Sequence, residues 1–103
     1  MSKGGSHEPM NSSYTADFVQ KVSDVLQNHM RRNKRESMTA DKCAVLLANR
    51  RILPAGPPKL GFNFRQMLRD GRDGKIGRDG KKIPLVTGAW QARPHTKWII
   101  KRV

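Results

Sequence analysis

Arg65, Gln66 and Arg69 have the side-chain types and spacing with the most specific chemistry in this sequence. Residues one, three and four positions apart can share the outer side of one short helix. An arginine guanidinium can donate two hydrogen bonds to the edge of guanine, and a glutamine amide can pair with the edge of adenine. Side chains of these types are therefore able to read DNA bases if a helix carries them outward. The alternative is that they form a solvated helix surface.

Seven further cations follow at positions from which they could contact phosphates or reach into the minor groove. They are Arg72, Lys75, Arg78, Lys81, Lys82, Arg93 and Lys97. Five of them fall in residues 69–82 (RDGRDGKIGRDGKK), where glycine recurs at every third position. This stretch is too short for a collagen helix and contains no proline, and its cations would oppose the calcium ion that Asp-Gly pairs suggest. We expect a flexible basic loop.

Catalytic and metal-binding chemistry is disfavoured. A metal-dependent nuclease needs clustered carboxylates, whereas Asp70, Asp73 and Asp79, the acids of the second half, lie among arginines and lysines. Cys43 is the only cysteine, and with three scattered histidines it fits no usual zinc-ligand spacing. We expect Cys43 to be a small buried residue. The sequence thus predicts a protein that is not an enzyme and uses no metal and no cofactor.

The net charge of +13 indicates a polyanionic partner. Residues 1–49 carry seven basic and five acidic side chains, whereas residues 50–103 carry fourteen and three. Neutralising phosphates releases condensed counterions, which makes nucleic acid the usual partner of such a chain. Double-stranded DNA is favoured over RNA, because the chain has few aromatic residues on which unpaired bases could stack. A homodimer is an open option.

The apolar runs are too short for a membrane span or a signal peptide. We therefore expect no membrane partner and a cytoplasmic, nucleoid-associated location, or a nuclear one in a eukaryote. The run Arg31-Arg32-Asn33-Lys34-Arg35 has three interpretations. It could be a solvated helix end, a phosphate contact or, in a eukaryote, a nuclear localisation signal.

A single domain over residues 13–103, after a disordered tail at residues 1–12, can position these side chains. Its first helix is predicted over residues 15–33, with Ser13 or Thr15 as the N-cap. Apolar residues at helical spacing form one stripe along this helix. The stripe suits either the core of the domain or the seam of a dimer.

Two more helices follow. One is predicted over residues 40–51 with Thr39 as its N-cap, and a connector rich in proline ends it. A short third helix is predicted over Phe64 to Asp70, with Asn63 as its N-cap, Gln66 completing a capping box, and Gly71 at its C-terminal end.

The C-terminal part is predicted to form a β-hairpin. Residues 83–91 and 97–103 are rich in β-branched and aromatic side chains, and the segment between them contains proline and polar residues. Trp90 and Trp98 are expected to pack on the helical core or on each other. The predicted fold class is mainly α with a C-terminal β-hairpin, in a winged-helix-like arrangement with a three-helix core.

The stretch from Thr39 onward resembles a winged helix–turn–helix DNA-binding domain, as in MerR-type regulators and phage excisionases. The resemblance lies in the short helix at 64–70, in Gly88-Ala89-Trp90-Gln91, and in Trp98-Ile99-Ile100-Lys101-Arg102. A long connector with several prolines at residues 52–60 and the glycine-rich insert at 69–82 depart from that pattern. The resemblance implies that Arg65, Gln66 and Arg69 face the major groove and that the hairpin tip touches the DNA backbone.

Three functions fit these observations. The first is a non-catalytic, sequence-specific DNA-binding regulator of transcription or of a mobile element. The second is a general nucleic-acid-binding protein, either architectural or associated with RNA. The third is a small basic adaptor that binds and inhibits an acidic host protein.

Overall fold

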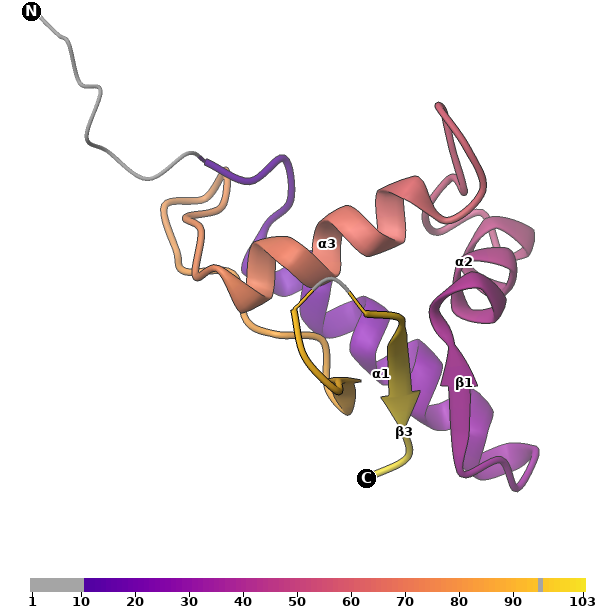
Figure 1. Cartoon of the computed structure of the whole chain (residues 1–103). Coiled ribbons are helices and arrows are strands. Elements are labelled where there is room, and N and C mark those ends of the chain that lie inside the picture. The colour runs from indigo at the N-terminus through magenta and orange to yellow at the C-terminus, as the bar shows by residue number, and fades with distance from the viewer. Residues whose placement is uncertain (1–10, 95) are drawn as a thin grey trace, which may run out of the picture.

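Three helices and a three-stranded antiparallel sheet make up the computed structural model, which describes residues 11–94 and 96–103 (Figure 1). The elements in chain order are α1 (Ala16–Arg32), β1 (Ser37–Thr39), α2 (Ala40–Asn49), α3 (Phe62–Arg72), β2 (Ala89–Gln91) and β3 (Trp98–Lys101). The predicted three helices and C-terminal hairpin are confirmed. The sheet has one strand more than the sequence predicted.

The additional strand, β1, joins two distant parts of the chain. The sheet order is β1-β3-β2, so that β3 is the central strand. Met38 of β1 pairs with Ile100 of β3, and both side chains are buried. On the other edge, Trp90 of β2 pairs with Ile99. The hairpin is therefore anchored to the start of α2 through β1.

The first two helices begin where the sequence predicted. The Thr15 hydroxyl accepts a hydrogen bond from the amide of Phe18 (3.1 Å), and the Thr39 hydroxyl accepts one from the amide of Lys42 (3.2 Å). Each cap satisfies an amide that the helix itself leaves unpaired. Along the apolar stripe of α1, Val22 and Leu26 are fully buried in the core, and Phe18 and Val25 are partly buried against it. The stripe therefore serves the core of the domain rather than a dimer seam.

The predicted ends of α3 are wrong. The helix starts earlier than predicted, after Gly61, whose φ of 84° is the left-handed conformation that glycine adopts easily. Asn63 is not the N-cap, because its side-chain amide donates to the carbonyl oxygens of Pro54 (3.0 Å) and Gly56 (3.4 Å). Gly71 is not the stop either and lies inside the helix. Asn63 and Gly71 instead allow other segments of the chain to pack against α3.

The strands of the hairpin are shorter than predicted. Ile83 and Val86, expected in the first strand, are buried in the core outside any strand. Trp98 packs into the core with 7% of its surface exposed, as predicted, but Trp90 is 44% exposed. The Lys101 ammonium lies 4.6 Å from the centre of the Trp90 ring. Packing on the core is thus confirmed for Trp98 and wrong for Trp90, and among the described residues the two tryptophan rings do not stack on each other.

The glycine-rich stretch is divided between two elements. Residues 69–72 belong to α3, and residues 73–82 form a loop that is held by backbone hydrogen bonds, such as Gly77 N to Lys81 O (2.7 Å). Of the tail expected at residues 1–12, residues 1–10 lie outside the described part. Ser12 is buried, and its amide donates to the carbonyl oxygen of Ile76 (2.7 Å). The folded part therefore includes Ser12.

Candidate nucleic-acid interface

Three arginines form a stripe along one side of α3. Arg65, Arg69 and Arg72 follow at intervals of four and three residues, which places them on the same side of a helix. Phe64 and Met67 of the same helix are fully buried. The apolar residues therefore fix the helix against the core and leave the arginine stripe toward the surface.

Arg65, the first arginine of the stripe, is bonded within the protein. Its Nη1 lies 2.5 Å from the carboxylate of Asp41 at the start of α2, and its Nη2 donates to the carbonyl oxygen of Leu60 (2.9 Å). One quarter of its side chain remains exposed. Arg65 thus ties α3 to α2, a role that sequence reasoning missed because Asp41 lies 24 positions away.

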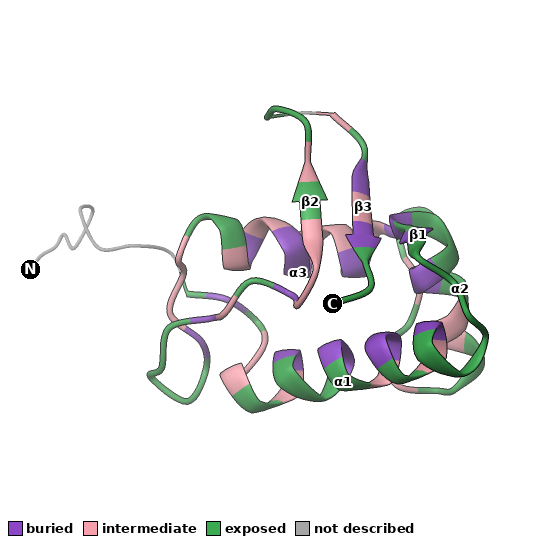
Figure 2. Ribbon diagram, turned by 90° about the horizontal axis from the view of Figure 1, so that it is seen from below, coloured by how far each residue is buried: buried purple, intermediate pink, exposed green. Residues whose placement is uncertain are grey.

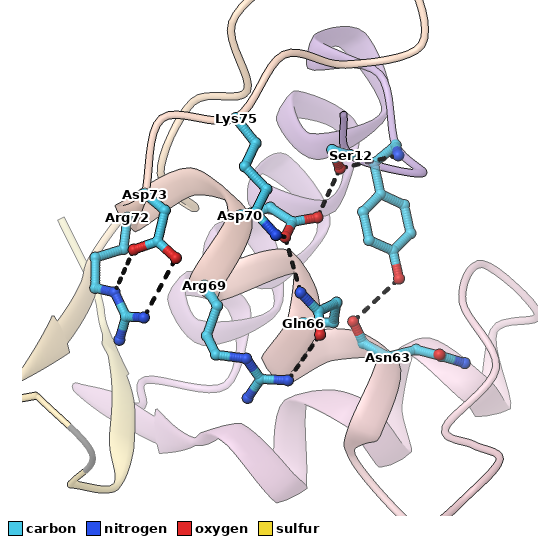
Figure 3. Close-up of polar contacts among 9 residues, drawn as sticks. Ser12, Asn63, Gln66, Arg69, Asp70, Arg72, Asp73 and Lys75 are labelled. Carbon is cyan, nitrogen blue, oxygen red and sulfur yellow. Dashed lines mark hydrogen bonds and ion pairs between the residues drawn. The ribbon is translucent and has the colours of Figure 1, made fainter. Parts of the chain in front are cut away.

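Gln66 and Arg69 are held together by a chain of hydrogen bonds (Figure 3). Arg69 Nη2 donates to Gln66 Oε1 (2.9 Å), and Gln66 Nε2 donates to Asp70 Oδ1 (2.9 Å). Asp70 also accepts from the Ser12 hydroxyl (2.7 Å) and lies 3.4 Å from the Lys75 ammonium. Since only 2% of Asp70 is exposed, the network has a buried anchor, which orients Gln66 and Arg69.

Arg72 connects the end of α3 to the hairpin. Its Nε donates to the carboxylate of Asp73 (2.9 Å), and this hydrogen bond holds the pKa of Asp73 below its ordinary value. Its guanidinium carbon lies 5.9 Å from the centre of the Trp98 ring, a distance at which the ring attracts a cation. The Nη1 group reaches the side-chain oxygen of Gln91 (3.4 Å). The hairpin is therefore held next to α3.

A groove lies between the start of α2, the start of α3 and the part of the hairpin where its turn leads into β3. It is lined by Thr39, Ala40, Asp41, Lys59, Arg65, Thr96, Lys97, Trp98 and Ile99. Lys97, a predicted phosphate contact, thus lies in the same groove as Arg65, a predicted base contact. Lys59 joins them although the sequence did not indicate it, because the connector that contains it has no periodic pattern.

The other predicted phosphate contacts lie in two places. Arg93 is exposed in the turn of the hairpin, near the groove residue Thr96, and His95 lies outside the described residues. Arg78, Lys81 and Lys82 are exposed in the loop after α3, whereas Lys75 is partly buried beside Asp70. The amide of Arg78 donates to the carbonyl oxygen of Tyr14 (3.0 Å), so that this loop lies at the start of α1.

No protein-family model, curated protein or solved structure matches this chain.

Metal-ligating and reactive groups are sparse in the described part of the chain. Within residues 11–94 and 96–103, no three His, Cys, Asp or Glu side chains gather as they would around a metal ion. Cys43 is buried in the core as predicted, and burial raises the pKa of its thiol to about 12. A thiol with such a pKa is protonated at neutral pH and is a poor nucleophile.

None of the helices described is both long and apolar enough to cross a bilayer.

Proposed function

We propose that this chain is a non-catalytic DNA-binding protein of the winged-helix type. In this proposal α3 enters the major groove, while the hairpin and the basic loop after α3 contact the DNA backbone. The proposed role is that of a sequence-specific regulator of transcription or of a mobile element.

The order and placement of the elements support this proposal. Three helices are followed by a hairpin, and the hairpin is held beside α3 by Arg72, Trp98 and Gln91. Such an arrangement suits a helix in the major groove with a wing on the neighbouring backbone. The residues that resemble MerR-type and excisionase modules lie in these same elements.

The observation on which the proposal mainly rests is the arginine stripe of α3 beside a cationic hairpin. A single α-helix fits the major groove of B-DNA, where arginine can read guanine and glutamine can read adenine. Arg69 uses one donor for Gln66, and its guanidinium has five. Gln66 bonds Asp70 and Arg69 with its two amide atoms, but its nitrogen keeps a second hydrogen and its oxygen a second lone pair for a base. Base reading is therefore assigned mainly to Gln66 and Arg69, and Arg65 first has to release or share Asp41.

Selection of bound sequences from a random duplex pool at moderate salt tests the proposal, followed by affinity measurements with the Arg69→Ala variant. We expect this variant to lose at least about tenfold in affinity for the selected site. Its affinity for random duplexes should change much less. Lys21→Ala, which removes an exposed cation from α1, serves as the matched control and should affect both duplexes only slightly.

Other outcomes lead to the other two functions. Equal losses on selected and random duplexes would leave a general nucleic-acid-binding protein with no base-reading helix. If the protein binds no nucleic acid at low salt but forms a stable complex with an acidic protein, the chain is an adaptor and the proposal is wrong.

A further inference from the structure

A second group of cations gathers where α1 and α2 end, apart from the groove and the arginine stripe of α3, and it includes the run at residues 31–35. We call it the end cluster: Arg31, Arg32, Lys34, Arg35, Arg50 and Arg51. All six are exposed. Four follow or end α1, and two follow α2, so that the fold brings together cations from two separate segments.

Contacts around His29 show how closely the two segments approach. The Arg50 Nη2 group lies 3.4 Å from the Nδ1 atom of His29 in the last turns of α1. Partial burial lowers the pKa of His29 below its ordinary value, and the charges of Arg50, Arg35 and Arg32 lower it further. Cations from both segments therefore act on the same imidazole.

The end cluster lacks carboxylate partners in the described part of the chain. Three ion pairs occur among residues 11–94 and 96–103, and none of them includes a residue of the cluster. Favourable interaction with the helix dipoles explains some cations at helix C-termini. It does not explain why Lys34 (φ 54°) and Arg51 (φ 57°) occupy left-handed positions, where glycine would be less strained.

The end cluster is separated from the groove by the length of α2. The groove includes Thr39, Ala40 and Asp41 at the start of α2, whereas Arg50 and Arg51 follow its end. Ten residues of helix span about 15 Å at a rise of 1.5 Å per residue. Figure 2 shows α1, at whose end the other four cations lie, on the side of the molecule away from the β2–β3 hairpin.

We propose that the end cluster binds the phosphate backbone of a second DNA segment, so that one molecule bridges two duplexes. The first duplex is the one held by α3 and the hairpin, and to this extent the inference rests on the proposed function. Contact with phosphates needs cations and no base-reading side chains. A protein partner is less suited, because interface cores are typically apolar, and the two segments that form the cluster, residues 31–35 and 50–51, contain no apolar residue.

Capture of a second duplex tests the bridge. One duplex is fixed to beads, the full chain is bound at low salt, and a fluorescent duplex of unrelated sequence is added. The cluster variant Arg35→Gln/Arg50→Gln is compared with Lys21→Gln/Lys42→Gln, which removes the same charge from exposed positions of α1 and α2 outside the cluster. Thermal unfolding verifies that both variants are folded.

We expect the wild type and the control variant to retain the fluorescent duplex. The cluster variant should retain at least about tenfold less, because two phosphate contacts are lost, while its affinity for a single duplex changes by less than about twofold. This pattern would support the bridge.

The remaining outcomes separate the two proposals. A wild type that binds one duplex but captures no second one overturns the bridge and leaves DNA binding intact. A wild type that binds no duplex at all overturns the proposed function itself. If both variants lost capture equally, net charge rather than the cluster would account for it, and the bridge would be wrong. If the cluster variant still captured the second duplex, the bridge would also be wrong, and self-association of the protein would account for capture. If the cluster bound polyglutamate but no second duplex, the bridge would be wrong, and the partner of the cluster would be an acidic protein.

Discussion

At the scale of single residues, the buried carboxylate of Asp70 determines how α3 presents its polar side chains. A buried charge is tolerated only where hydrogen bonds and an opposite charge compensate for lost hydration. Ser12, Gln66 and Lys75 supply this compensation. Gln66 in turn accepts a hydrogen bond from Arg69. Asp70 is therefore a positioning residue for the proposed base-reading pair.

Replacing Asp70 by alanine is expected to lower the free energy of unfolding by about 2 kcal/mol, because buried polar partners lose their hydrogen bonds. Urea denaturation measures this change. Asp73→Ala is the matched control, since the neighbouring carboxylate is 47% exposed and pairs with Arg72. Its loss should cost less than about 1 kcal/mol. If the two variants were equally stable, Asp70 would not anchor the network.

Helical spacing correctly predicted that Gln66 and Arg69 lie on one helix, but nothing in the sequence indicated that Asp70 is buried. Its local sequence, rich in arginine and glycine, is typical of a solvated loop. The hydroxyl that accounts for its burial belongs to Ser12, 58 positions away. Helical spacing predicts which residues share a side of one helix, but it contains no information about which distant segment covers that side.

At the scale of the elements, the packing of α3 against residues 84–85 depends on Gly71. A Cβ atom at this position would lie 2.5 Å from the carbonyl oxygen of Pro84 and 2.7 Å from the Cα of Leu85. Both are backbone atoms that cannot turn away as a flexible side chain can. The glycine thus allows the chain to return from the loop directly against α3.

Gly71→Ala is expected to destabilise the protein by about 1–3 kcal/mol, because overpacking outweighs the better helix propensity of alanine. Chemical denaturation measures the effect. Gly80→Ala is a suitable control, since a Cβ there meets nothing within 4 Å and only its φ of +81° is unfavourable. That strain costs about 1 kcal/mol. A stabilised Gly71→Ala variant would show that residues 84–85 are free to move away from α3.

The sequence predicted the elements whose ends depend on neighbouring residues, and it failed where an element depends on distant ones. The starts of α1 and α2 depend on caps that lie next to them, and both were predicted correctly. For α3, the local rule that glycine often follows the last turn of a helix placed Gly71 at the C-terminal end. The structure shows instead that a glycine is needed at this position because the backbone of Pro84 lies close to it. Strand β1 was missed because three residues hold little periodicity, and its partner β3 lies about 60 positions further along the chain.

At the scale of the whole molecule, the distribution of charge was predicted only in part. The excess of cations in residues 50–103 pointed to α3, to the loop after it and to the tip of the hairpin. The end cluster was not predicted as a unit, because residues 31–35 belong to the half with little net charge. Only the approach of Arg50 to His29 of α1 adds the two cations that follow α2 to them.

The dependence of DNA affinity on salt tests whether the loop after α3 contacts the backbone. Each phosphate contact contributes about 0.9 to the slope of log affinity against log salt concentration. Lys81 and Lys82 are exposed, and replacing both by glutamine should reduce the magnitude of this slope by about 2 if each binds one phosphate. Affinities for a single short duplex, measured at several salt concentrations, give the slope.

Lys21→Gln/Lys42→Gln removes the same charge elsewhere and distinguishes contact from the general field of the protein. Counterion release depends on phosphates that are neutralised at close range, whereas the net charge acts on both variants alike. We therefore expect the slope of this control to stay close to that of the wild type. Equal reductions in both variants would mean that the loop does not touch the backbone, and phosphate binding would then have to be assigned to the groove and the hairpin alone.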